Sequence, residues 1–482
     1  MAPRIAIVGA GFGGLCMAIR LRRAGFGSFT VFERAGGLGG TWRDNTYPGA
    51  GCDIPSHLYS YSFERYGSWT RRYPEQGEIL AYLEHCADKY DVRRNIRFNA
   101  EVVSASFDGS RWHLATADGG SETFDAVVMA VGQLHRPHLP EIPGMSDFAG
   151  TMFHSARWRH DHDVTGRDVA VIGSGSSAAQ LIPRVAERAR RLTVFQRTPN
   201  WVVPKPDAAF GPAARLALRL VPGLQRVYRE WLFHYMEHTL HPALAGGWSA
   251  AVLERRAREH LRAQVPDPEL RARLTPGYPV GCKRVVIDSA FYPALTRPNV
   301  EVVTERIVRV VPGGVETTGG VHEADTIVCA TGFRTTEFLA PIEVTGRAGR
   351  PLAAQWTGGA HAYLGISVPH FPNLFLLYGP NTNLGHNSIV FMIECQVRHI
   401  LACLRELPRH GPLEVRPEAM TAWTRQLDRA MARMVWGDGC QSWYRTPEGR
   451  VTNNWPGRAT LYRRLTARPP LPAYRRAVRS LP

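Results

Sequence analysis

A strand, a glycine-rich turn and a helix follow one another at the N-terminus, and this unit constrains the fold more than any other feature. Residues 4–8 are an apolar run typical of a buried parallel strand, and Gly9, Gly11 and Gly14 follow it directly. A helix-compatible segment and a second apolar strand come next, and that strand ends at Glu33. Glycines in this order let backbone N–H groups at a helix start approach a pyrophosphate, which the helix dipole favours. The unit predicts a dinucleotide-binding α/β domain, and we call its glycine turn the first cradle.

The same unit occurs a second time further along the chain. Residues 169–172 form an apolar strand, Gly173 and Gly175 follow it, and Ser176 begins a helix-compatible segment. A later strand ends at Gln196. We call this second glycine turn the second cradle. Two such units in one chain predict an α/β protein with two Rossmann-like dinucleotide-binding domains.

The residues that end the second strand of each unit indicate which dinucleotide each cradle would bind. Glu33 is placed to accept hydrogen bonds from ribose hydroxyls, and its charge would repel a ribose 2′-phosphate. The corresponding position of the second unit holds the neutral Gln196, and Arg197 after it can clamp such a phosphate. We therefore expect FAD at the first cradle and NADPH at the second.

Length, composition and charge exclude several classes of protein. A chain of 482 residues with 44% apolar residues suits folded domains and excludes a disordered chain. No stretch provides the ~20 uninterrupted apolar residues of a membrane span, and the chain starts with a strand rather than a signal peptide, so we expect a cytoplasmic protein. The net charge of +16 comes from dispersed arginines, which we attribute to a phosphate-bearing cofactor and a solvated surface rather than to nucleic acid.

The cysteines argue against a disulfide framework and against a metal site. The chain has eight cysteines, far apart in sequence and without any C-x-x-C pair. A disulfide scaffold or a structural zinc site would need closer, repeated spacing. We expect reduced thiols and no metal, which makes a disulfide reductase less favoured.

Two nucleotide sites in one chain imply electron transfer between them, because hydride passes readily from nicotinamide to flavin. The two cradles alone leave two classes of enzyme open. One is a flavin reductase that acts on disulfides or quinones, and the other is a flavin monooxygenase.

A segment between the two units favours the monooxygenases. Residues 148–158 match F-x-G-x-x-x-H-x-x-x-W at every fixed position. The chain here resembles the Baeyer–Villiger monooxygenases, which carry this fingerprint and usually continue with Pro or Asp where this chain has Arg159. The sister family of N- and S-oxidising flavin monooxygenases normally has Tyr or Phe at the position of Trp158. This position favours the ketone-oxidising branch, and we expect His154 and Trp158 to be structural rather than catalytic.

Two further motifs agree with this resemblance. Residues 40–53 match G-x-W-x-x-x-x-Y-P-G-x-x-x-D, and residues 277–284 are similar to the family's G-Y-P-x-G-x-K-R. The resemblance implies that Arg284 is the active-site arginine beside flavin and nicotinamide, and that Lys283 helps bind the 2′-phosphate. Asp53 follows the first cradle closely enough to face the isoalloxazine ring.

The candidate cofactor-binding residues come from the two cradles and these motifs. For FAD they are Gly9, Gly11, Gly14, Glu33, Gly40, Thr41, Trp42 and Asp53, and for NADPH they are Gly173, Gly175, Ser176, Arg197, Thr198 and Lys283.

The resemblance also implies a reaction. NADPH would reduce FAD, O₂ would add at the flavin C4a to give a peroxyflavin, and attack on a ketone would yield an ester or lactone. Arg284, which keeps its proton, would stabilise the negative peroxide and adduct, and Asp53 would hold Arg284 in place. The alternatives are an N- or S-oxygenating enzyme on the same scaffold and an NADPH oxidase or quinone reductase. We expect a monomer or a weak homo-oligomer.

The motifs also suggest how the chain is divided. We expect residues 1–144 and 336–482, the latter with a basic tail, to form the FAD domain, and residues 145–335 to form the NADPH domain. A segment over about 205–275 has the composition of a helical insertion. Trp443 and Tyr444 lie in a stretch that in the family approaches substrate and NADP⁺. An equally favoured interpretation is that these two side chains form a hydrophobic anchor at the surface.

Overall fold

Two five-stranded parallel sheets form the centres of the computed structural model, which describes residues 3–437, 442–469 and 471–477. The first sheet has the order β19-β7-β1-β2-β3 and consists of β1 (Ile5–Val8), β2 (Phe29–Phe32), β3 (Ile96–Arg97), β7 (Ala126–Met129) and β19 (Leu374–Leu376). The second has the order β13-β10-β9-β17-β8 and consists of β8 (Thr151–His154), β9 (Asp168–Ile172), β10 (Arg191–Phe195), β13 (Val300–Val303) and β17 (Thr326–Cys329). The predicted α/β fold with two Rossmann-like sheets is confirmed.

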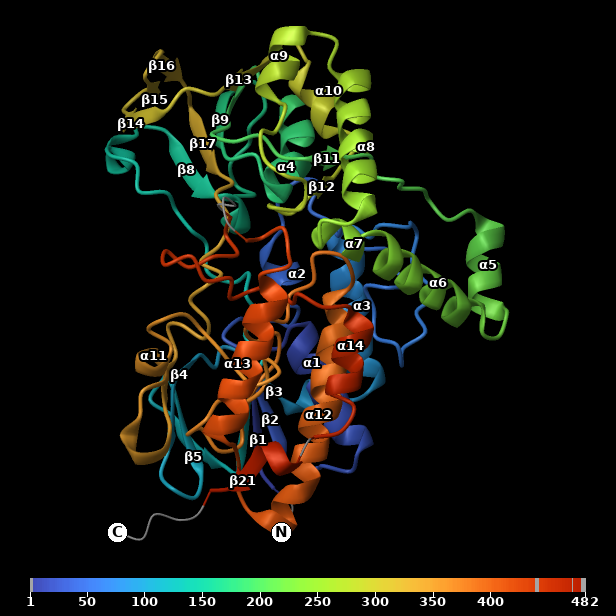
Figure 1. Cartoon of the computed structure of the whole chain (residues 1–482). Coiled ribbons are helices and arrows are strands. Elements are labelled where there is room, and N and C mark those ends of the chain that lie inside the picture. Colours follow the sequence, from blue (N-terminus) through green and yellow to red (C-terminus); the bar gives the residue numbers. More distant parts are fainter. Residues whose placement is uncertain (1–2, 438–441, 470, 478–482) are drawn as a thin grey trace.

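The two sheets repeat one arrangement. In each, the strand before the glycine turn is central and fully buried, and it pairs in parallel with the strand that follows its helix. Strands buried on both faces read as continuous apolar runs, which is why β1 and β9 are recognisable in the sequence. Figure 1 shows the second sheet in the upper part of the molecule and the first sheet in the lower part.

Each central strand leads into a helix that packs against its sheet. Helix α1 (Phe12–Arg23) contacts α12 (Ile389–His410) and α3 (Gln76–Lys89), so an N-terminal helix and a C-terminal helix share one core. Helix α4 (Ser176–Ala186) contacts α10 (Phe291–Leu295) beside the second sheet. In the apolar run at residues 374–378, strand β19 ends at Leu376.

Smaller elements surround the two sheets. The other sheets are formed by β4 (Val102–Phe107), β5 (Trp112–Thr116), β6 (Ser121–Phe124) and β18 (Glu343–Thr345); by β14 (Ile307–Val311), β15 (Gly314–Thr317) and β16 (Gly320–Glu323); by β11 (Val202–Val203) and β12 (Val286–Ile287); and by β20 (Leu413–Val415) and β21 (Tyr474–Arg476). Further α-helices are α2 (Thr41–Asp44), α11 (Leu352–Gln355), α13 (Pro417–Met431) and α14 (Ala459–Leu465).

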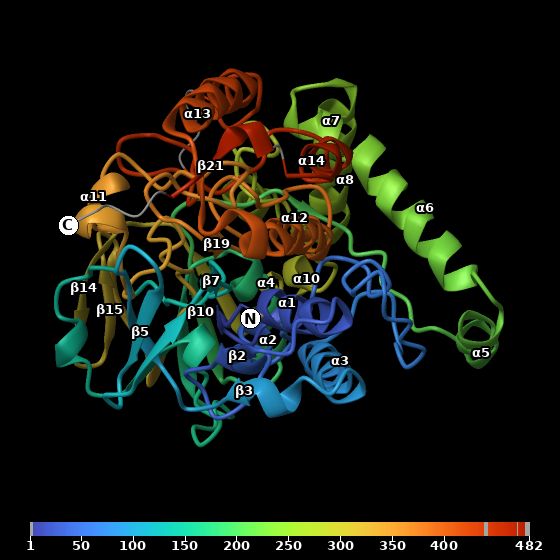
Figure 2. The same cartoon turned by 90° about the horizontal axis from the view of Figure 1, so that it is seen from below.

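Helices fill the segment in which the sequence indicates an insertion. They are α5 (Pro212–Leu220), α6 (Leu224–Thr239), α7 (His241–Leu244), α8 (Trp248–Gln264) and α9 (Pro268–Arg273). Figures 1 and 2 show α5 and α6 projecting to one side of both sheets, with α5 farthest out.

A buried carboxylate fastens α6 to the C-terminal part of the chain. Glu237 is fully buried and accepts from His386 Nε2 at 3.1 Å, from Asn387 Nδ2 at 3.2 Å, and from Thr460 N and Oγ1 at 3.1 Å each. Burial alone would raise the pKa of Glu237, but these hydrogen bonds and the facing imidazole outweigh it and bring the pKa to about 2. The ionised carboxylate therefore holds three segments together.

The cysteines differ in part from the expectation of reduced thiols. Six of them are unbonded and buried, namely Cys16, Cys52, Cys86, Cys329, Cys395 and Cys403. Cys282 is disulfide-bonded, so the expectation is wrong for this residue, because sequence spacing does not show which distant thiols meet. Cys440 lies outside the described residues. In the described part of the chain, no helix is long and apolar enough to cross a membrane.

The first glycine turn yields a stability prediction. A Cβ at Gly14 would lie 1.8 Å from the Gly9 carbonyl oxygen, whereas a Cβ at Gly13 would lie 3.5 Å from Leu377 Cβ, an ordinary contact. Gly14→Ala should therefore lower the free energy of unfolding by about 3 kcal/mol or more. Gly13→Ala is the matched control and should stay within about 1 kcal/mol, because alanine favours the helix.

Denaturant unfolding of the two variants beside the wild type measures this difference. Equal stability of both variants would show that the helix does not need to approach the turn so closely.

Candidate active site

One cavity of about 1290 Å³ is lined by both cradles. Its wall includes Val8 and Gly9 where β1 ends, and Ile172 and Gly173 where β9 ends. Ligands of open α/β sheets bind outside the carboxyl ends of the parallel strands, so both nucleotide sites open into one space.

The first cradle has the geometry that a pyrophosphate needs. Gly9 has φ +103°, and a Cβ there would lie 2.6 Å from the Ala130 carbonyl oxygen, so only glycine fits. Gly11 is the N-cap of α1, whose first turn carries no acidic side chain. Gly14 does not line the cavity. Its lack of a side chain lets α1 pack closely against the glycine turn.

The carboxylate that follows the first cradle is fixed by backbone groups. Glu33 is buried and lines the cavity; its Oε2 accepts from Ala10 N at 2.8 Å and its Oε1 from Ala35 N at 2.9 Å. Gly40 lies against this cradle, since a Cβ there would be 3.2 Å from Gly11 Cα.

The second cradle repeats the first. Gly173 has φ +119°, and a Cβ there would lie 2.4 Å from the Ala330 carbonyl oxygen. Gly175 is the N-cap of α4, Ser176 is the first helical residue, and the first turn again has no acidic side chain. Both helix starts are therefore free to bind phosphate, as FAD and a nicotinamide dinucleotide require.

Two cations line the cavity into which the second cradle opens. Arg197 and Lys283 both line the cavity together with Thr198, and neither cation forms an ion pair with any acidic residue of the described chain. Lys283 Nζ lies 4.9 Å from the centre of the Tyr278 ring. Burial and the nearby Arg197 charge lower the pKa of Lys283. Such a pair of cations fits a 2′-phosphate.

An ion pair lies in the wall between the two cradles. Arg284 donates from Nε to Asp53 Oδ2 at 3.1 Å and from Nη2 to both carboxylate oxygens at 2.6 Å. The two side chains are 33% and 16% exposed, and both line the cavity. The Asp53 charge raises the pKa of Arg284 further, so the guanidinium is a permanent cation.

The same cavity wall contains the motif residues Thr41 and Trp42. Trp42 donates from Nε1 to the Tyr59 hydroxyl at 3.1 Å. All candidate site residues named from the sequence therefore line this cavity, with Gly14 the one exception.

Aromatic residues lie near the ion pair, and they include Trp443 and Tyr444 of the stretch that the resemblance relates to substrate and NADP⁺. Tyr378 donates its hydroxyl hydrogen to Asn383 Oδ1 at 2.7 Å, and its φ of +57° is unusual for a tyrosine. Tyr444 is buried, which raises its pKa to about 12. Trp443 lines the cavity, and its ring centre lies 4.2 Å from that of Tyr444. Of these three residues, Tyr378 is the one that the sequence analysis does not name.

The fingerprint residues lie away from the cavity. His154 is buried, its Nδ1 accepts from Ala156 N at 3.0 Å, and burial lowers its pKa to about 4, so the ring is neutral. Trp158 packs edge-on against Phe153 with ring centres 5.2 Å apart. Neither side chain touches the space between the cradles.

Two dinucleotide cradles opening on one cavity, with a fixed cation between them, define a flavin-dependent oxidoreductase. The family model described as flavin-binding monooxygenase-like matches residues 2–216. A Baeyer–Villiger monooxygenase of Streptomyces coelicolor is 44% identical over 98% of this chain and 92% of its own length. Another Baeyer–Villiger monooxygenase, from Pseudomonas aeruginosa, is 42% identical over 96% of this chain and 89% of its own length. The chain belongs to the Baeyer–Villiger monooxygenase family, and the resemblance seen in the sequence is confirmed.

Solved structures agree with this membership. A steroid monooxygenase bound to NADP superposes with a TM-score of 0.87 at 34% identity, covering 97% of each chain. A closed form of cyclohexanone monooxygenase superposes with a TM-score of 0.86 at 30% identity, and the match also covers 97% of each chain.

The pair of cations generates a prediction about cofactor choice. Arg197→Ala should raise the KM for NADPH about tenfold or more and leave the KM for NADH nearly unchanged, because a charge-assisted phosphate contact is lost. Steady-state kinetics with both nucleotides measures the effect. Arg255→Ala, at an exposed arginine of α8, is the control and should change neither constant. Equal increases for NADH and NADPH would remove the phosphate role.

Proposed function

We propose that the chain inserts one oxygen atom beside the carbonyl carbon of a ketone to give an ester or lactone, with Arg284 and Asp53 as the catalytic pair. The observation that carries this proposal is the two-pronged ion pair in the wall of the cavity that both cradles share. Its position lets one fixed cation serve both nucleotide sites.

The cradles fit FAD and NADPH. Each turn depends on a glycine whose Cβ would collide with a neighbouring carbonyl oxygen, and each helix start lacks a competing acidic side chain. We assign FAD to the cradle followed by Glu33, and NADPH to the cradle that Arg197 and Lys283 face. When bound, FAD and NADPH supply the reducing equivalents with which O₂ is activated for transfer to the substrate.

Arg284 supplies the electrostatic part of the reaction. Asp53 occupies the Nε and Nη2 edge of the guanidinium, and no residue of the described chain accepts from Nη1. Nη1 is thus the group left to donate to oxygen that becomes negative while it bonds to the carbonyl carbon. A fixed donor of this kind needs no reorganisation when the charge develops.

Asp53 acts by positioning. Its two oxygens fix the plane of the guanidinium, and without them the long arginine side chain would have several rotamers in the open cavity. Tyr378 and Tyr444 lie near this pair: burial raises the pKa of both hydroxyls, and the Arg284 charge opposes that effect.

We also propose the division of the chain. Residues 1–144 and 336–482 form the FAD domain, which is supported by the pairing of β19 with β7 in the first sheet. Residues 145–335 form the NADPH domain, which is supported by the second sheet being built from residues 151–329 alone.

Substitution of the arginine tests the assignment of the catalytic pair. Arg284→Ala should still allow NADPH to bleach the flavin but should lower ester formation at least about 100-fold, the usual effect of losing one such donor. Stopped-flow absorbance follows the reduction, and gas chromatography quantifies the ester.

Two further variants sharpen the result. Arg284→Lys keeps the positive charge but loses the two-pronged guanidinium group. Its ester formation should therefore remain well below that of the wild type. Arg334→Ala removes a surface ion pair with Glu337 and should form ester at the wild-type rate. Undiminished ester formation by Arg284→Ala would refute the role of this residue.

A further inference from the structure

Large apolar side chains gather on the outer part of the helical insertion. Six of the fourteen large apolar side chains that are exposed in the described chain fall within residues 216–235. They are Leu216, Leu220, Val221, Val227, Trp231 and Tyr235, each between 48% and 66% exposed. We call these six residues the apolar ridge. Contiguous exposed apolar surface on an otherwise polar protein marks a binding surface.

The α6 part of the apolar ridge is permanently exposed. Val227, Trp231 and Tyr235 follow at intervals of four and share one face, and the Trp231 and Tyr235 rings stack with centres 5.7 Å apart. The opposite face is fastened to the body: Arg229 donates to the His57 carbonyl oxygen at 2.7 Å, and Phe233 packs on Phe391. The helix therefore cannot rotate to bury these rings.

The α5 part combines apolar and basic side chains. Helix α5 has no buried residue, Leu216 and Leu220 lie one turn apart, and Arg215 and Arg219 lie beside them at the same spacing. Figures 1 and 2 show this helix standing away from both sheets. Helix α5 contacts α6 at its end, yet it buries none of its own residues within the described chain.

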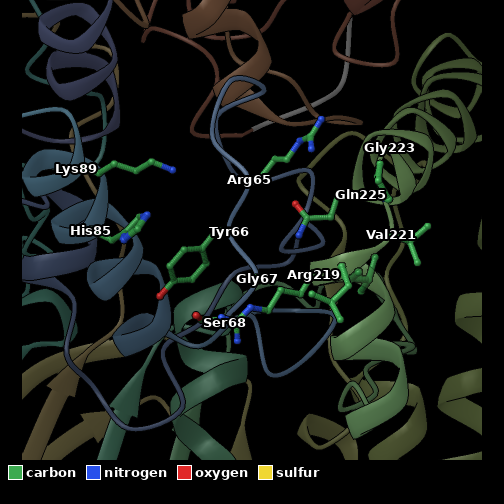
Figure 3. A pocket seen from close by; sticks show the side chains of 13 residues that line it. Arg65, Tyr66, Gly67, Ser68, His85, Lys89, Arg219, Val221, Gly223 and Gln225 are labelled. Atoms are coloured by element: carbon green, nitrogen blue, oxygen red, sulfur yellow. The ribbon is translucent and has the colours of Figure 1, made fainter.

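A basic pocket adjoins the ridge. A cavity of about 390 Å³ lies between residues 65–68, α3 and the α5–α6 turn. Figure 3 shows Arg65 on the 65–68 segment, Lys89 on α3 and Arg219 near the end of α5. Lys89 is paired with the buried Glu64 at 2.8 Å, whereas Arg65 and Arg219 have no carboxylate partner among the described residues. Each of these two unneutralised guanidinium groups can pair with a phosphate.

We propose that the apolar ridge and the basic pocket dock the enzyme on the surface of an anionic phospholipid bilayer. Leucine, valine, tryptophan and tyrosine side chains enter the headgroup and acyl boundary, and Arg65 and Arg219 each pair with lipid phosphates. The net charge of +16 draws the whole molecule toward such a surface.

Two other partners fit less well. A second copy of the chain has the same charge and would bring the arginines of α5 into opposition with one another. Nucleic acid would satisfy the arginines and stack on the aromatic rings, but it has no place for Leu216, Leu220 and Val227. A bilayer accommodates both kinds of side chain.

Vesicle flotation of the flavin-loaded full chain tests this proposal. The wild type should float with vesicles of equimolar phosphatidylcholine and phosphatidylglycerol and not with phosphatidylcholine alone. The double variant Leu220→Glu/Trp231→Glu should bind at least about tenfold more weakly, because two apolar anchors are lost. The double variant Arg65→Glu/Arg219→Glu should lose binding to a similar extent.

Matched controls separate the ridge from the rest of the surface. Val321→Glu replaces an apolar residue of β16 that is 56% exposed, and Arg350→Glu reverses an exposed charge outside the insertion; both should bind like the wild type. All variants should keep the wild-type melting temperature and NADPH oxidation rate without vesicles, which shows that they are folded.

Several results would overturn the proposal. They are failure of the wild type to float with anionic vesicles, equal binding of the ridge variant, or loss of binding in the control variants as well. Dimerisation abolished by the ridge variant, in the absence of vesicle binding, would assign the surface to a second copy. Oligonucleotide binding abolished by the same substitutions would assign it to nucleic acid.

Discussion

The ion pair between Arg284 and Asp53 connects the two halves of the molecule at the place where both cradles open. Asp53 comes from the loop after α2, next to the first sheet, and Arg284 comes from the segment that leads into β12, beside the second. Residues 231 apart in sequence are thereby fixed within 2.6 Å of each other. The orientation of the proposed catalytic cation depends on this interaction, while contacts such as Tyr47 with Gln180 at 2.8 Å also join the two units.

The energetics of this pair suit its proposed role in catalysis better than they suit stability. A partly buried ion pair gains little net free energy, because desolvation offsets much of the Coulombic attraction. Its benefit lies in a cation that is already oriented when negative charge develops on oxygen. The glycine turns serve the same end, because Gly9 and Gly173 let the helix starts reach the pyrophosphates without any side chain between them.

Local features of the fold could be predicted from the sequence, and long-range ones could not. The glycine turns are predictable because spacing within one strand, turn and helix determines them, as at Gly9 and Gly173. Asp53 and Arg284 required the resemblance, since nothing local distinguishes them from solvated charges. The burial of Tyr444 and the bonded state of Cys282 depend on packing between distant segments, which no local pattern encodes. The apolar ridge could not be predicted from the sequence either. Trp231 and Leu232 are neighbouring apolar residues, and only the fold shows that Trp231 is exposed and Leu232 buried.

The most direct test of the account is the product formed by the purified enzyme from NADPH, O₂ and a panel of ketones, amines and sulfides. Mass spectrometry with isotopically labelled O₂ should detect esters or lactones that are one labelled oxygen heavier than their ketones, in proportion to the NADPH consumed. N-oxides or sulfoxides with every ketone unchanged would contradict the account. NADPH consumption matched only by hydrogen peroxide would contradict it as well.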